Sequence, residues 1–95
     1  MWLWLIATAK AHATPDVIAA KRHQWVAQGK DRELTARCRL AQRYVVEGAT
    51  PPKVFWLLDT DAPETVELIT EHFGDLWSIE VMPVTPQHLS QATSR

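Results

Sequence analysis

The sequence predicts an α+β fold whose strands and helices follow one another in the order βαββαβ. Two short stretches, 2–9 and 53–60, are apolar on both faces, as strands in the middle of a sheet are. Two longer stretches, 14–29 and 61–74, open on a helix-capping signal, a cap residue followed by Pro in the first and a capping box in the second, and close on Gly, which is typical of helices. This order is that of the split βαβ, or ferredoxin-like, plait, and we expect a single domain over residues 1–95.

The N-terminal stretch is predicted to be a strand. Successive side chains of a strand point to opposite faces, which gives two apolar sets: Trp2, Trp4, Ile6 and Leu3, Leu5, Ala7, Ala9. The same stretch has small residues after an apolar run, as a signal peptide does, but no Lys or Arg precedes it and the run is short. It is also far below the ~20 residues that cross a membrane. We therefore expect neither a signal peptide nor a membrane segment.

The first helix is predicted to begin after Thr14, with Pro15 in its first turn, and to run to about Gln28. Gly29 can take the left-handed conformation that ends a helix. The apolar stripe is thin, consisting of Val17, Ile18, Trp25 and Val26. The segment from Lys30 onwards fits either a frayed last turn or a loop.

The second strand is predicted over residues 37–47, with Leu40, Gln42, Tyr44 and Val46 on one face and Arg39, Ala41, Arg43 and Val45 on the other. A turn over 48–52, rich in Gly and Pro, leads to the third strand, 53–60. The second helix follows, with Asp61 and Glu64 as a predicted capping box. Its buried face is Val66, Ile69 and Phe73, its solvent face is Glu64, Glu67 and Glu71, and Gly74 ends it.

The fourth strand is predicted over residues 76–84. Trp77, Ile79 and Val81 share one face, and Ser78, Glu80 and Met82 share the other. Pro83 cannot donate a hydrogen bond to a neighbouring strand, so this strand lies at an edge or ends there. Thr85 and Pro86 repeat the cap-plus-Pro signal and predict a short C-terminal helix that holds His88 and Leu89.

This topology leaves one face of the sheet without a cover. The two strands that are apolar on both faces occupy the centre of such a sheet, and the helices cover only one of its faces. The simplest cover for the other face is a second copy of the chain, stacked sheet to sheet. We therefore expect a homodimer, a dimeric α+β barrel.

The composition is that of an ordinary globular protein, with 46% hydrophobic residues, 22% charged residues and a net charge of −1. It has neither a basic excess nor the aromatic-plus-basic strands that bind RNA, so we expect no nucleic-acid partner. Cys38 is the only cysteine, which excludes an internal disulfide and fits a reducing cytoplasm. The four histidines are scattered without metal-ligand spacing, so we expect no metal and no other cofactor.

Glu80 is the strongest candidate for a functional carboxylate, because it lies in the middle of an apolar run. Between two stacked sheets its pKa would rise, as those of catalytic bases often do. Alternatively, Glu80 pairs with Arg39 or Arg43, or is simply exposed. Arg43 could instead hold an anionic ligand through its planar fork. Trp4 and Trp56 line a ligand pocket in one interpretation and fill the core and interface in the other.

The segment from Phe55 to Pro86, "FWLLDTDAPETVELITEHFGDLWSIEVMPVTP", resembles the second half of the small domains grouped as DUF3303. The shared features are an apolar strand ending in an acidic step, a helix, a "DLWxIEVxPV" strand and a Thr/Pro exit. The resemblance implies a ferredoxin-like dimeric barrel and supplies no catalytic residues. Relatives by fold include small monooxygenases, isomerases and stress-response proteins, which is analogy alone.

Two functions remain open from the sequence. The first is a non-enzymatic binding or accessory module, a homodimer holding a small apolar ligand between its sheet and helices. The second is a cofactor-independent monooxygenase or isomerase with Glu80 as proton acceptor and Arg43 or a histidine as electrostatic stabiliser. A polar cavity around Glu80 would favour the enzyme, and a space filled by Trp and Leu would favour the module.

Overall fold

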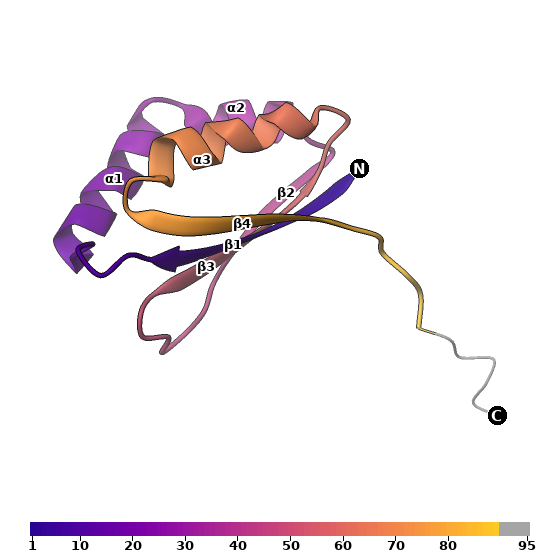
Figure 1. Ribbon diagram of the computed structural model, residues 1–95. Helices are drawn as coiled ribbons and strands as arrows, with labels where there is room; N and C mark the ends of the chain where they lie inside the picture. The colour runs from indigo at the N-terminus through magenta and orange to yellow at the C-terminus, as the bar shows by residue number, and fades with distance from the viewer. Residues whose placement is uncertain (90–95) are drawn as a thin grey trace.

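A computed structural model describes residues 1–89 of the chain (Figure 1). The strands and helices follow one another along the chain as β1 (Trp2–Ala9), α1 (Pro15–Ala27), α2 (Lys30–Ala36), β2 (Leu40–Val45), β3 (Lys53–Asp59), the 3₁₀ turn η1 (Pro63–Val66), α3 (Glu67–Phe73) and β4 (Trp77–Val84).

The four strands form one sheet in the order β2-β3-β1-β4, with antiparallel neighbours throughout. The predicted ferredoxin-like plait is thereby confirmed, including the central place of the two strands that are apolar on both faces. β4 is an edge strand, as Pro83 indicated.

The helices lie on one face of the sheet, and in Figure 1 no helix lies on the other. The core fills the space between helices and sheet. An aromatic contact joins the sheet to the helices, since the ring centroids of Trp56 in β3 and Phe73 in α3 are 5.9 Å apart, and another joins two helices, since those of Trp25 in α1 and Phe73 are 5.1 Å apart. The buried side chains of β1 and β3 are Leu3, Leu5, Ala7, Ala9, Val54, Trp56 and Leu58.

The first helix begins and ends where the sequence predicts. The Thr14 hydroxyl accepts a hydrogen bond from the backbone N–H of Val17 at 3.3 Å, and Gly29 has φ of 73°. Beyond Gly29 the chain forms the helix α2, where the sequence fits either a frayed last turn or a loop. Leu34 is the buried residue of α2. A helix of seven residues is too short to show a periodic apolar pattern in the sequence.

The second strand is shorter than predicted, because Arg37 is the C-cap of α2 and the strand begins only at Leu40. The predicted capping box at Asp61 is wrong. The Asp61 carboxylate accepts a hydrogen bond from Arg39 at 2.8 Å, and the hydroxyl of Thr60 accepts from the backbone N–H of Ala62 at 3.2 Å. An arginine two strands away along the chain thus competes successfully for the carboxylate.

The predicted C-terminal helix is not formed over residues 85–89, and residues 90–95 lie outside the described part of the chain. Leu89 is 88% exposed, so this segment buries no apolar face against the domain. A short helix without such packing is unstable in water, which explains why the cap-plus-Pro signal at Thr85 is not sufficient.

Candidate functional site

Glu80 lies on the face of the sheet that no helix covers, directly opposite Ile6 of β1. Its side chain is exposed, and it has no hydrogen bond or ion pair within residues 1–89. The register therefore places the Glu80 side chain away from the helices, as the sequence predicts. The pairing with Arg39 that was one alternative is not present, since Arg39 bonds to Asp59 and Asp61.

Arg43 does not lie near Glu80. Its register partner is Trp56, which is buried beneath the helices, so Arg43 belongs to the helix-covered face. The strands that carry Arg43 and Glu80 are also the two opposite edges of the sheet. Within one chain, Arg43 is thus neither the ion-pair partner nor the electrostatic stabiliser of Glu80 that the sequence suggested.

The two candidate tryptophans are separated in the same way. Trp4 lies on the uncovered face, where its ring centroid is 5.4 Å from that of Phe55 and 6.4 Å from that of Tyr44. Trp56 lies on the covered face and is 5% exposed. The four predicted pocket residues therefore form two sites: Trp4 with Glu80 on the uncovered face, and Trp56 with Arg43 below the helices.

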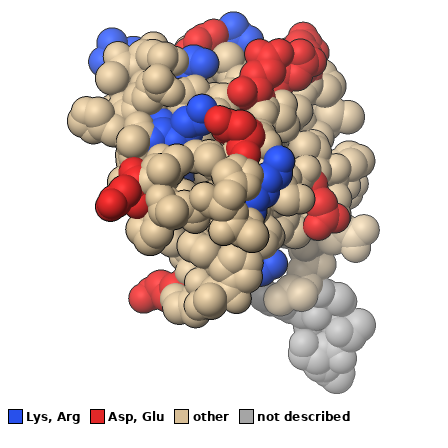
Figure 2. Space-filling view, turned by 60° about the vertical axis from the view of Figure 1, so that its left-hand side comes forward, with Lys and Arg blue, Asp and Glu red and all other residues tan. Residues whose placement is uncertain are grey.

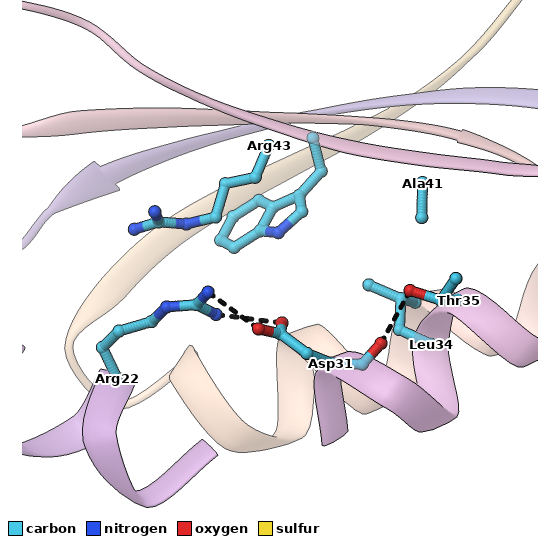
Figure 3. A pocket seen from close by; sticks show the side chains of 7 residues that line it. Arg22, Asp31, Leu34, Thr35, Ala41 and Arg43 are labelled. Carbon is cyan, nitrogen blue, oxygen red and sulfur yellow. Dashed lines mark hydrogen bonds and ion pairs between the residues drawn. The ribbon is translucent and has the colours of Figure 1, made fainter. Parts of the chain in front are cut away.

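The second of these sites is a cleft of about 280 Å³ between α1, α2 and the β2 edge of the sheet. Leu34, Ala41 and Trp56 provide its apolar lining. Figure 3 shows Arg22 and Asp31 rising from the helices and Arg43 reaching in from the strand opposite. The full lining is Arg22, Asp31, Leu34, Thr35, Ala41, Arg43 and Trp56.

Asp31 organises the helical side of the cleft. Its two carboxylate oxygens accept hydrogen bonds from the guanidinium of Arg22, at 3.1 Å and 2.9 Å, and one of them also accepts from the indole N–H of buried Trp25. Burial raises the pKa of Asp31, but these hydrogen bonds and the charges of Arg22 and Arg43 outweigh it, so the pKa lies below its usual value. Asp31 is therefore a carboxylate at neutral pH.

Arg43 differs from Arg22 because, within residues 1–89, its guanidinium has no hydrogen bond and no ion pair. Partial burial and the nearby charge of Arg22 lower the pKa of Arg43, while Asp31 opposes this. An arginine nevertheless stays protonated under ordinary conditions. The cleft thus contains two positive charges and one negative charge.

Sequence reasoning missed Arg22 and Asp31 as functional residues. Arg22 lies in the middle of α1 and Asp31 in the segment whose structure the sequence left open, nine positions later. No helical or strand spacing relates the two, since the turn at Gly29 brings them together. The one local hint is that Asp31 comes two residues after Gly29, where the first helix ends and the chain can fold back.

Other reactive side chains lie outside this cleft. Cys38 is partly buried, and burial raises the pKa of its thiol, which makes it a poorer nucleophile. His72 is buried and bonds through Nε2 to the backbone carbonyl of Lys21 at 3.0 Å. Among residues 1–89, no three His, Cys, Asp or Glu side chains are grouped so as to hold a metal ion.

Charges of both signs are interspersed over the helical part of the surface in Figure 2, while the lower part of that view is mostly uncharged. Within the described residues, no helix has the length and apolar character needed to traverse a bilayer.

Comparison with known proteins identifies the fold. No protein-family model matches the chain, and no curated protein matches it in sequence. Three solved structures are similar over nearly the whole chain. Protein Atu4242 of Agrobacterium tumefaciens has a TM-score of 0.58 and 11% identity, covering 96% of this chain and 98% of its own.

Protein At3g17210 of Arabidopsis thaliana has a TM-score of 0.54 and 16% identity, covering 94% of this chain and 97% of its own. A structure described as an antibiotic biosynthesis monooxygenase has a TM-score of 0.53 and 16% identity, covering 90% and 100% respectively. The chain thus shares an α+β, ferredoxin-like fold with these solved structures. At these identities the likeness defines the fold and assigns no activity.

Proposed function

We propose that the chain is a homodimeric binding module that closes its uncovered sheet face against a second copy of itself. The observation that carries this proposal is the apolar centre of that face, formed by Trp2, Trp4, Ile6, Phe55, Leu57 and Met82. Each of these side chains is only half-buried in the single chain. A sheet face of this kind gains free energy when apolar area is removed from water.

The charged residues of the uncovered face support the same proposal through their positions. Lys53 and Asp59 lie at the two ends of β3, and Glu80 lies on the edge strand β4. An apolar centre with charges confined to the border is the arrangement of protein–protein interfaces. The ligand of the module is then held on the other side of the sheet, between sheet and helices, where the cleft lies.

A cofactor-independent oxygenase or isomerase is the second candidate function, favoured by the likeness to the structure described as a monooxygenase. Glu80 would be its proton acceptor. The surroundings of Glu80 weigh towards the module instead, because aromatic side chains occupy the centre of its face and, among residues 1–89, no arginine pairs with it. The proposal includes membership of the DUF3303 group, on the resemblance over residues 55–86. It also includes a reducing cytoplasmic location, which fits the unpaired Cys38.

Molar mass in solution tests the proposed dimer. Light scattering behind a sizing column, over a dilution series, is expected to give twice the 10.8 kDa of one chain. Trp4→Lys places a charge in the centre of the apolar face and is expected to shift the dimer to monomer. Val17→Lys is the control, because Val17 is 45% exposed on α1 and a lysine there stays in water.

A wild-type chain that is monomeric at every concentration would contradict the proposal. So would a Trp4→Lys variant that is folded by circular dichroism and still dimeric.

A further inference from the structure

We propose that the cleft lined by Arg22, Asp31 and Arg43 binds a small carboxylate with a single negative charge and a compact apolar body. This inference names the ligand of the binding module and in that respect rests on the proposed function. All of the residues that carry it nevertheless come from one chain.

Arg43 is the group that recognises the carboxylate. Its guanidinium has five N–H donors in a planar fork, and none of them is used within residues 1–89. Two parallel N–H···O bonds from such a fork fit the two oxygens of a carboxylate. The exposed side chain lies at the mouth of the cleft, and Figure 3 shows it extending over the cleft from the sheet.

Arg22 and Asp31 define the charge that the ligand carries. Asp31 holds Arg22 through two hydrogen bonds, and the indole of Trp25 holds Asp31, so this ion pair is fixed before a ligand arrives. Two guanidinium groups and one carboxylate leave a net charge of +1. A monoanion neutralises that charge, whereas a dianion such as a phosphate monoester would add negative charge beside Asp31.

The remaining lining explains why the ligand has an apolar body. Leu34, Ala41 and Trp56 are the side chains behind the three charged residues. The hydroxyl of Thr35 donates to the backbone carbonyl of Asp31 at 2.8 Å, so its proton is not free to bind an anion. The carboxylate is thereby directed to Arg43 and the body to the indole and the aliphatic side chains.

The volume of the cleft limits the size of the ligand. The cleft has a volume of about 280 Å³. This is at the lower limit of pockets that enclose drug-sized molecules, which begin at about 300 Å³. A ligand with one small ring or a short branched chain fits within this volume, whereas a nucleotide or a haem would extend beyond it.

The test is an NMR titration of the full ¹⁵N-labelled chain with benzoate, which has the predicted charge and size. Benzamide, with the same shape and no charge, and phenyl phosphate, which approaches two charges, are the comparison ligands. Loss of a hydrogen bond to a charged group weakens binding about tenfold or more, so Arg43→Met is expected to raise the Kd for benzoate by at least that factor. Arg43→Lys, which keeps the charge and loses the fork, is expected to give an intermediate Kd.

Arg32→Met is the matched control, since Arg32 is an exposed arginine of α2 that does not line the cleft. It is expected to leave the Kd for benzoate within about twofold, because a lone surface charge contributes little. Benzamide that binds as tightly as benzoate, phenyl phosphate that binds more tightly, or an Arg43→Met variant with unchanged affinity would overturn the inference. Absence of any benzoate-dependent shift would do the same.

The molar mass of the same samples separates this inference from the proposed function. Arg43-dependent binding of benzoate to a monomer would contradict the dimer and support the carboxylate site. A dimer that does not bind benzoate would contradict the carboxylate site and leave the dimer intact.

Discussion

The two faces of the sheet are built from the same strands but end in different environments. On the covered face, Leu5 and Leu58 are completely buried and Trp56 is nearly so. Their neighbours in sequence, Ile6, Leu57 and Phe55, point to the uncovered face and remain half-buried. Both sets are equally apolar, so the difference arises from which face the helices of the chain cover. The comparison shows that this chain encodes more apolar sheet surface than its own helices bury.

The covered face also contains the polar cleft, so it is not apolar throughout. The cleft lies at the β2 edge, beside α2, whose one buried side chain is Leu34. Arg43 occupies the sheet position that a further apolar side chain would otherwise fill. The covered face therefore combines a tightly packed centre with a charged, open edge, and the uncovered face combines an apolar centre with a charged border.

The largest effect is expected from removing a tryptophan on the covered face. Trp77 is 5% exposed and packs in the core, so Trp77→Ala should lower the free energy of unfolding by about 3–5 kcal/mol. Trp4→Ala, on the uncovered face, removes the contacts of a half-buried side chain with Phe55 and Tyr44, so it should cost less in the monomer, with a further loss that grows with the fraction of dimer. Thermal melts at several protein concentrations measure the stability of both variants. A negligible loss of stability in Trp77→Ala would place Trp77 outside the core.

A smaller effect is expected at Asp31, which links α1 and α2 over the cleft. Asp31→Ala removes the acceptor of the buried Trp25 indole and should cost about 1–3 kcal/mol in urea unfolding at pH 7. Asp31→Asn keeps an acceptor oxygen and should cost less than about 1 kcal/mol, since the ion pair with Arg22 is largely exposed. Equal losses in the two variants would show that the indole bond contributes nothing.

The same residue gives a pH dependence whose sign follows from its pKa. The pKa of Asp31 is lower in the folded chain than the ordinary value of 3.8. Its contribution to stability is therefore complete above about pH 4 and is lost as the pH falls through the folded-state pKa. Unfolding of wild type and Asp31→Asn between pH 7 and pH 2 should show the two curves converging at the acid end.

The smallest effect is expected at Glu80 on the uncovered face. Because Glu80 is exposed and has no partner among residues 1–89, Glu80→Gln should change the free energy of unfolding by less than about 0.5 kcal/mol. Urea unfolding of the two proteins measures this directly. A loss of more than about 1 kcal/mol would mean that the carboxylate acquires an ion-pair partner from a second copy of the chain.

The order of strands and helices could be predicted because each element has its own local signal. Thr14 and Pro15 specify where α1 starts, Gly29 where it ends, and the doubly apolar strands specify the centre of the sheet. Such signals act between residues close in sequence, where steric and hydrogen-bonding preferences operate without the rest of the fold.

The errors occurred where residues distant in sequence compete. Asp61 was predicted to cap a helix and instead bonds to Arg39, 22 positions earlier. A pairing of Glu80 with Arg43 was one of the alternatives that the sequence left open because their charges match, and the sheet order separates the two residues. A charge has no preferred partner in the sequence alone, because the interaction depends on distance in space.

The fold class, the orientation of Glu80 and the surplus of apolar sheet surface therefore follow from the sequence alone, because local capping signals and the alternation of side chains along strands specify them. Which charges meet depends instead on the tertiary structure. Arg22, Asp31 and Arg43 come together because the turn at Gly29 and the place of β2 at the sheet edge position them around one cleft. Arg43 is the residue of that cleft left without a partner within residues 1–89, because the Asp31 carboxylate is already engaged by Arg22 and Trp25.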